Sequence, residues 1–187
     1  MRSLKLQMHL TLDNFSNMED GGPNFKWDNE VITFCVNNLK SVDTILLGRK
    51  TAEILIPFWD DVAKKTEHPD LALGKRIAEL PKVVFSNTIT NHSLRNTAII
   101  SGNFDDEISK LKNSKGKDIL VYGGVSFASA LIQNKLVDEF YFVLNPFCQG
   151  TGLSIFKENK DMLAFNLVKT LPFPCGSVML NYKPNLL

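Results

Sequence analysis

Short, uninterrupted apolar runs recur along the first two thirds of the chain. Runs of this kind, which lack a polar residue at every second position, are typical of strands that are buried on both faces of a sheet. We therefore predict buried strands at residues 45–47, 83–85, 99–100 and 119–122.

Amphipathic segments lie between these runs. Apolar residues from Ile32 to Leu39 fall at the i, i+3, i+4 and i+7 positions of one helix face, and Asp28 stands at the expected N-cap. Residues 71–80 stop at Pro81, and residues 105–112 have acids at their start and lysines at their end. Both segments are therefore also predicted to be helices.

The last third of the chain has a different pattern. Residues 140–145 alternate before Pro146, and residues 167–171 and 178–182 are two further short strands, which we expect to pair antiparallel. Alternating strands and helices that give way to a strand-rich end predict an α/β protein. The expected architecture is a three-layer sandwich around a mostly parallel sheet with an antiparallel C-terminal edge, formed as a single domain by residues 1–187.

Size and composition narrow the class of protein. The 187 residues suit one domain with a substantial core. The chain has 21 Lys and Arg against 20 Asp and Glu, without a long block of one sign, so nucleic acid is not an expected partner. Polar residues interrupt the N-terminal segment, and no apolar run approaches membrane-spanning length. We expect a cytoplasmic protein without membrane contact.

The cysteines give no sign of a disulfide framework or a metal site. Cys35, Cys148 and Cys175 are odd in number, far apart in the sequence and never spaced as CxxC. We expect reduced thiols and no bound metal.

Two consecutive glycines in the stretch DILVYGGVSFASALI, residues 118–132, suggest a ligand site. Gly123 and Gly124 separate a predicted strand from a predicted helix at residues 125–133. A strand that leads directly into a helix leaves free backbone N–H groups, which attract an anion such as pyrophosphate. A tight turn without a ligand explains the pair equally well, because the full GxGxxG fingerprint and its acidic partner are missing.

A second junction of this kind is TILLGRKTAE, residues 44–53. After Gly48, the planar guanidinium of Arg49 can bind a phosphate through two N–H groups, Lys50 adds a point charge, and Thr51 can donate its hydroxyl. The alternative is a solvated basic turn.

A third junction is KVVFSNT, in which Ser86, Asn87 and Thr88 follow a strand. These residues can bind a phosphate or a ribose, although they are also common turn formers. The carboxyl ends of parallel strands face a common crevice. Three junctions with phosphate-binding residues therefore favour a phosphorylated ligand more than any one of them does alone.

At these residues the chain resembles the dihydrofolate reductase superfamily, specifically the branch that includes the C-terminal reductase domain of bifunctional riboflavin-biosynthesis enzymes. It departs from the pattern at Asn14, where the family has glycine, but Asn tolerates a left-handed conformation. It also lacks the HxE and PCxxC motifs of the fused zinc deaminase. The matching motifs span nearly the whole chain in register: HLTLDNF, LLGRKTAE, PKVVFSNT, ILVYGGVSFASALI and LVDEFYFVLNPFCQGTGLSIF.

The resemblance implies a dihydrofolate reductase-like fold and an NADPH-dependent reductase that acts on a small nitrogen heterocycle of the pterin, folate or ribosylamino-pyrimidine class. It also implies a homodimer, since relatives commonly form one. Around the adenosine 2′-phosphate and pyrophosphate it places Gly48, Arg49, Lys50, Thr51, Ser86, Asn87 and Thr88. Beside the pyrophosphate and nicotinamide it places Gly123, Gly124, Val125, Ser126 and Phe127.

Few residues are candidates for proton transfer. The resemblance points to an acid near the start of the first helix, where Glu30 is the better candidate because Asp28 suits an N-cap; Glu30 can also complement the helix dipole. Asp13 matches the acid of the family's Leu-Asp-Gly motif, but it can equally stabilise its turn through an Asx bond. His9, within the first strand, is expected to be structural, although a histidine can titrate near neutrality.

Other readings remain open. Trp27 and Tyr122 are candidates for stacking on a flat heterocycle, whereas Phe34 is expected to pack in the core. A catalytically idle nucleotide-binding or regulatory module would retain the cleft without the chemistry. A third reading is a dimerisation scaffold whose interface is the aromatic strand at residues 140–144.

Overall fold

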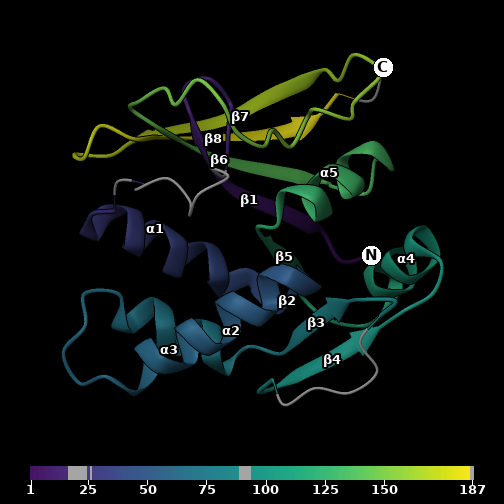
Figure 1. The fold of residues 1–187 in the computed structure, drawn as a ribbon, viewed down its shortest axis with the longest axis horizontal. Coiled ribbons are helices and arrows are strands. Elements are labelled where there is room, and N and C mark those ends of the chain that lie inside the picture. Colours follow the sequence, from purple (N-terminus) through teal and green to yellow (C-terminus); the bar gives the residue numbers. More distant parts are fainter. Residues whose placement is uncertain (17–24, 26, 89–93, 186–187) are drawn as a thin grey trace.

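The computed structural model describes residues 1–16, 25, 27–88 and 94–185. Strands and helices alternate through most of this part and give way to strands at its end (Figure 1). Along the chain the elements are β1 (Leu4–Thr11), α1 (Asn29–Asn38), the 3-10 turn η1 (Leu39–Ser41), β2 (Val42–Gly48), α2 (Arg49–Lys64), α3 (Leu71–Glu79), β3 (Lys82–Phe85), β4 (Thr97–Ile100), α4 (Phe104–Asn113), β5 (Asp118–Tyr122), α5 (Val125–Gln133), β6 (Glu139–Asn145), β7 (Phe165–Pro172) and β8 (Val178–Pro184).

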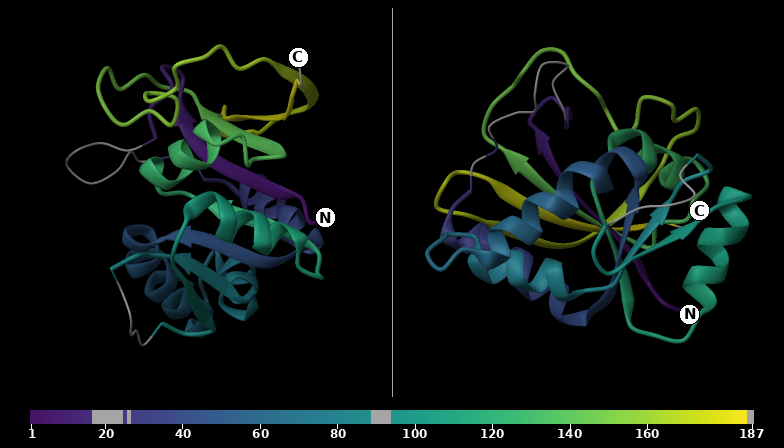
Figure 2. Two further views of the ribbon diagram at one scale, coloured as in Figure 1. Left: turned by 90° about the vertical axis from the view of Figure 1, so that its right-hand side faces the viewer. Right: turned by 60° about the horizontal axis from the view of Figure 1, so that its bottom comes forward.

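The strands form one eight-stranded sheet in the order β4-β3-β2-β5-β1-β6-β8-β7. The pairs from β4 to β6 are all parallel, whereas β8 pairs antiparallel with both β6 and β7. The predicted sheet, mostly parallel with an antiparallel C-terminal edge, is confirmed. The direction of the strands changes progressively across the sheet, as its twist requires (Figure 2).

Two helical layers cover the sheet, and each has its own core. Buried residues of α1, α2 and α3 pack in one cluster, and buried residues of α4 and α5 pack in the other. Successive residues of the central strands alternate between the clusters: Ile45 and Leu47 belong to the first and Leu46 to the second. This alternation explains the uninterrupted apolar runs, because both faces of these strands are buried.

Two sequence-based expectations need correction. Ile99 and Ile100 form part of a strand, but β4 lies at the edge of the sheet and its residues are half-buried or exposed. The aromatic strand at residues 140–144 is no interface either. It lies in β6, between β1 and β8, and Phe140 and Phe142 are buried in the core.

The predicted helices form close to their expected bounds. Asp28 caps α1 by accepting a hydrogen bond from the Val31 N–H at 2.8 Å. The helix after Gly48 continues for 16 residues although it contains Pro57. Because β2 and β5 run parallel and side by side, the helices that follow them begin at the same edge of the sheet.

Candidate functional site

Two strand-to-helix junctions meet at the carboxyl edge of the sheet. A Cβ atom added to Gly124, before α5, would lie 2.6 Å from Oγ1 of Thr51 in the first turn of α2. A Cβ atom added to Gly48, before α2, would lie 2.9 Å from Cβ of Phe127 in α5. Each junction therefore has a glycine where the other approaches it most closely, and the starts of α2 and α5 are in contact.

Neither of these two helices has a side-chain N-cap. The N-cap residues are Gly48 for α2 and Gly124 for α5, and no side chain bonds the first-turn N–H groups from either position. By contrast, Asp28 caps α1 and Asn103 caps α4. Uncapped helix starts present N–H donors and the positive end of the helix dipole, so this pair is suited to an anion.

The two consecutive glycines adopt a conformation that other residues avoid. Gly123 has φ 69° and Gly124 has φ 81°. The backbone alone therefore favours glycine at both positions. A Cβ atom on Gly123 would meet only Cγ2 of Thr51, at 3.9 Å, so space remains beside this glycine.

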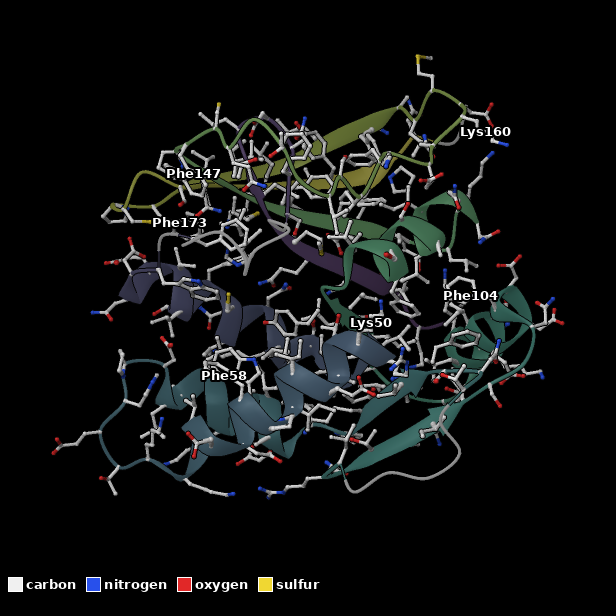
Figure 3. The ribbon with its side chains drawn as sticks, viewed as in Figure 1. Lys50, Phe58, Phe104, Phe147, Lys160 and Phe173 are labelled. Atoms are coloured by element: carbon white, nitrogen blue, oxygen red, sulfur yellow. The ribbon has the colours of Figure 1, made fainter. Side chains whose placement is uncertain are left out.

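The charged residues of the second junction lie on the first turn of α2. Lys50 is exposed and lies at the beginning of this helix, with Phe58 further along it (Figure 3). Nη1 of Arg49 lies 3.3 Å from Oε1 of Glu53, one helical turn later. The i, i+4 spacing predicts such a pair, so Glu53 is a partner of Arg49 that the sequence could have indicated.

The third junction lies beside the second, because Gly48 of β2 pairs with Phe85 of β3. Its polar side chains are engaged in local structure. Oγ of Ser86 accepts a hydrogen bond from the Thr88 N–H at 3.2 Å. Oδ1 of Asn87 accepts one from the Gly102 N–H at 2.8 Å and so links this junction to the loop before α4.

Three aromatic rings from the neighbouring junctions and from α4 pack against one another. The ring of Phe127 lies 6.5 Å from that of Phe85 and 5.7 Å from that of Phe104, at the start of α4. The Phe127 side chain therefore packs among the junctions, and its backbone N–H belongs to the first turn of α5.

The structure places Asp13 as an anchor between two loops. Its carboxylate accepts hydrogen bonds from the Thr11 hydroxyl and from the N–H groups of Gln149 and Gly150. These bonds, the Thr11 bond foremost, lower the pKa of Asp13. Asn14 adopts φ 65°, so the turn forms with asparagine in place of the family's glycine.

Asp28 and Glu30, the two acids at the start of α1, differ in their hydrogen bonding and exposure. One carboxylate oxygen of Asp28 accepts the Val31 N–H, and the other accepts the Cys175 N–H at 2.8 Å. The pKa of Asp28 is lowered: burial opposes ionisation, but the backbone hydrogen bonds outweigh it. Glu30 is exposed in the first turn, and α1 packs on the face of the sheet opposite α5.

His9 is half-buried, but both of its ring nitrogens are shielded from solvent and lack a polar partner among the described residues. Its ring stacks on Trp27, with 4.7 Å between centroids, and lies 5.4 Å from the ring of Phe25. Neither ring nitrogen has a hydrogen-bond partner among the described residues. Burial lowers the pKa of His9 from 6.5 to about 4, so it does not titrate near neutrality.

The remaining aromatic candidates differ from Trp27. Phe34 packs against Tyr141 and Phe173 at the first core, as expected. The Tyr122 ring packs against the same core, and burial raises the pKa of its hydroxyl. Trp27 is 42% exposed, so one part of it remains free to contact a ligand.

A separate cavity of about 390 Å3 lies away from these junctions. It is lined by residues near the end of α5 and the beginning of β6, including Ile132 and Phe140, and by residues 162–165 and 183–185. The glycine turns lie at the other end of these elements, so this cavity is not part of the candidate site.

Within the described ranges, no group of three or more metal-binding side chains is found. No described helix is long and apolar enough to cross a membrane.

Comparisons with known proteins identify relatives along the whole chain. The family model for the RibD C-terminal domain matches residues 2–179. The chain is 34% identical to the uncharacterized protein YyaP of Bacillus subtilis (strain 168) over 187 residues, which cover 98% of this chain and 96% of that protein.

Two solved structures show the shared fold. A putative riboflavin biosynthesis protein from Shewanella sp. PV-4 superposes with a TM-score of 0.77 at 22% identity, over 98% of this chain and 99% of that one. Dihydrofolate reductase from Enterococcus faecalis, complexed with NADP(H), superposes with a TM-score of 0.63 at 16% identity, over 98% of this chain and 96% of that one.

Proposed function

Because the chain belongs to the RibD C-terminal domain family, we propose that it is a reductase that binds NADPH where α2 and α5 begin. Its substrate is a small nitrogen heterocycle of the pterin, folate or ribosylamino-pyrimidine class. The observation that carries this proposal is the contact between two helix starts without side-chain caps, at Gly124 and Thr51.

The residues at the junctions fit a dinucleotide with an extra phosphate. The first-turn N–H groups of Val125, Ser126 and Phe127 suit the pyrophosphate, and the open space beside Gly123 admits it. Arg49 and Lys50 suit the adenosine 2′-phosphate, because both bear a positive charge at the start of α2. Ser86, Asn87 and Thr88 lie at the neighbouring junction and complete the proposed phosphate and ribose contacts.

When bound, NADPH would supply a hydride, and the substrate nitrogen or oxygen that gains charge would need a proton. The protein's part is to bind and orient both partners and to provide that proton. Asp13 serves by holding the loops after β1 and β6 together, since its carboxylate already accepts hydrogen bonds from three donors, the Thr11 hydroxyl and the N–H groups of Gln149 and Gly150.

Glu30 is the proposed proton donor. Its carboxylate is exposed, and within the described part of the chain no hydrogen bond or ion pair engages it. Replacing it in the variant Glu30→Gln should lower kcat without weakening NADPH binding.

The relatives support the substrate class. The Shewanella protein is described as a putative riboflavin biosynthesis protein, and the Enterococcus enzyme is a dihydrofolate reductase bound to NADP(H). Trp27 provides an exposed aromatic surface near the start of α1, which suits a flat heterocycle.

We also propose that the protein forms a homodimer in the cytoplasm. Leu167 and Val168 of the edge strand β7 are 55% and 52% exposed, an arrangement that favours association. Light scattering after size exclusion tests the assembly, and a monomer across the accessible concentration range contradicts it.

Turnover is the test of the function itself. The purified chain is incubated with NADPH and a panel of pterins, dihydrofolate and ribosylamino-pyrimidines, and the loss of reduced-nicotinamide absorbance is followed. Consumption with at least one of these compounds supports the reductase. Binding of NADPH without consumption across the panel indicates the idle nucleotide-binding module instead.

A further inference from the structure

His9 lies on the same face of β1 as residues that contact α1. Gln7, two positions earlier, bonds Cys35 and Asn38 of α1 and pairs with Tyr122 of β5. Side chains two residues apart share a face of the sheet. Because β1 and β5 run parallel and side by side, His9, near the carboxyl end of β1, lies at the same edge of the sheet as the glycine turn that follows β5.

The polar atoms of Gln7 have hydrogen-bond partners, whereas those of His9 have none among the described residues. Both ends of the Gln7 carboxamide have partners: its nitrogen lies 3.2 Å from Sγ of Cys35, and its oxygen accepts from Asn38 at 2.7 Å. Both ring nitrogens of His9 are buried, yet no described residue bonds either of them. Buried polar groups in native proteins usually have a partner, so these nitrogens need an explanation.

Packing alone does not explain a histidine at this position. The ring stacks on Trp27 as a flat hydrophobic group would, and a phenylalanine would do so without unpaired nitrogens. Burial also lowers the pKa of His9 to about 4, so near neutrality it has one N–H donor and one acceptor. An amide group on a planar ring offers the complementary acceptor and donor.

We propose that His9 is a specificity-determining residue, one of whose ring nitrogens hydrogen-bonds an amide group of the planar ring bound at this carboxyl edge of the sheet, while Trp27 fixes the imidazole plane. The inference rests on the proposed reductase function. The amide has two possible sources, namely the carboxamide of the nicotinamide ring and the lactam edge of a pyrimidine or pterin.

Calorimetric titration of the full chain separates these sources. The variant His9→Phe keeps a flat ring and removes both nitrogens. It is titrated with NADPH, with 2′-phospho-ADP-ribose, which lacks the nicotinamide ring, and with a uracil-type pyrimidinone in the presence of NADP⁺. His68→Phe is the matched control, because His68 lies in the loop between α2 and α3.

His9→Phe should bind 2′-phospho-ADP-ribose as the wild type does and lose roughly tenfold or more in affinity for one of the two amide-bearing ligands. A loss for NADPH assigns the amide to the nicotinamide, and a loss for the pyrimidinone alone assigns it to the substrate. His9→Gln, which retains a donor and an acceptor, should recover part of the loss. His68→Phe should change none of the affinities.

Nitrogen NMR of the wild-type imidazole provides a readout that does not depend on how the variant folds. One His9 ring nitrogen should shift when the amide-bearing ligand is added and stay in place with 2′-phospho-ADP-ribose. Unchanged affinities in His9→Phe together with an unmoved nitrogen overturn this inference and leave the proposed function standing. A wild-type chain that binds no NADPH overturns both.

Discussion

Gly124 and Thr51 belong to different strand-to-helix junctions, yet a Cβ atom on Gly124 would lie only 2.6 Å from Oγ1 of Thr51. This contact joins the N-terminal ends of α2 and α5, neither of which has a side-chain cap. The proposed dinucleotide site depends on that closeness, because it allows the donors of two helices to act on one anion.

Substitution of Gly124 should therefore be unusually costly. Gly124→Ala places a side chain at φ 81° and also against Thr51. Gly150→Ala is a matched control, since Gly150 has the same φ of 81° but an added Cβ would meet nothing within 4 Å. The control should lose roughly 1–2 kcal/mol of unfolding free energy from the backbone term. Gly124→Ala should lose roughly 1–3 kcal/mol more from the clash.

Denaturant unfolding of both variants measures this difference. In a Thr51→Ala background, Gly124→Ala should recover part of the extra loss, because Oγ1 is gone. Equal losses for the two glycines in the wild-type background would show that the junctions are not in close contact.

The ion pair between Arg49 and Glu53 should influence the choice of cofactor. Arg49→Ala should weaken NADPH by roughly 10–100-fold, through loss of a charge-assisted bond to the 2′-phosphate, and NADH by less than about threefold. Glu53→Gln should tighten NADPH by about twofold, since it removes a weak competing partner of Arg49.

Lys65 and Asp61 form a comparable i, i+4 pair at the other end of α2. Lys65→Ala should leave the affinities for both cofactors unchanged in the same titration. An equal loss of NADPH and NADH affinity in Arg49→Ala would disprove the 2′-phosphate contact.

The double role of Asp28 should appear in the stability of the fold. Asp28→Ala removes the cap of α1 and also the bond to the Cys175 N–H in the turn between β7 and β8. Asn103→Ala removes only the cap of α4, through its bond to the Asp106 N–H, and should cost about 1 kcal/mol. Asp28→Ala should cost roughly twice as much, as measured by denaturant unfolding, and a cost no greater than that of Asn103→Ala would contradict the two-bond role.

The shielded imidazole nitrogens of His9 should make the protein sensitive to mild acid. Its pKa is about 4 in the folded chain and near 6.5 when unfolded, so the unfolded state binds the proton first as the pH falls. The stability is complete well above pH 6.5 and should decline towards pH 4, by roughly 2 kcal/mol at about pH 5. Thermal melts should show this decline in the wild type and a weaker one in His9→Phe. Identical pH dependence in the two would rule out a buried neutral imidazole.

Local sequence patterns predict much of this fold. The uninterrupted apolar run at residues 45–47 becomes a strand buried on both faces, and Asp28 becomes the N-cap of α1. The apolar pair at residues 99–100 led to a wrong prediction of a buried strand, because an edge strand and a central strand can contain the same short apolar pair. Position in the sheet depends on strand order, which no single run encodes.

The candidate site is predictable where backbone conformation dictates the residue. Gly123 and Gly124 adopt the positive φ that makes such a pair informative in the sequence. The bonds of Asp13 to Gln149 and Gly150 join segments more than 130 residues apart, so no local pattern reveals them. The same holds for the unpaired nitrogens of His9, which become visible only when Phe25 and Trp27 are packed against its ring.

Thermal unfolding with and without NADPH tests the central claim most directly. A ligand that binds only the folded chain should stabilise it by roughly 2.7 kcal/mol at a free concentration about a hundred times its Kd, with a smaller effect from NADH. A melting temperature that rises with NADPH in the wild type, and rises less in Arg49→Ala, is the predicted result. A melting temperature that NADPH leaves unchanged at saturating concentration contradicts the account.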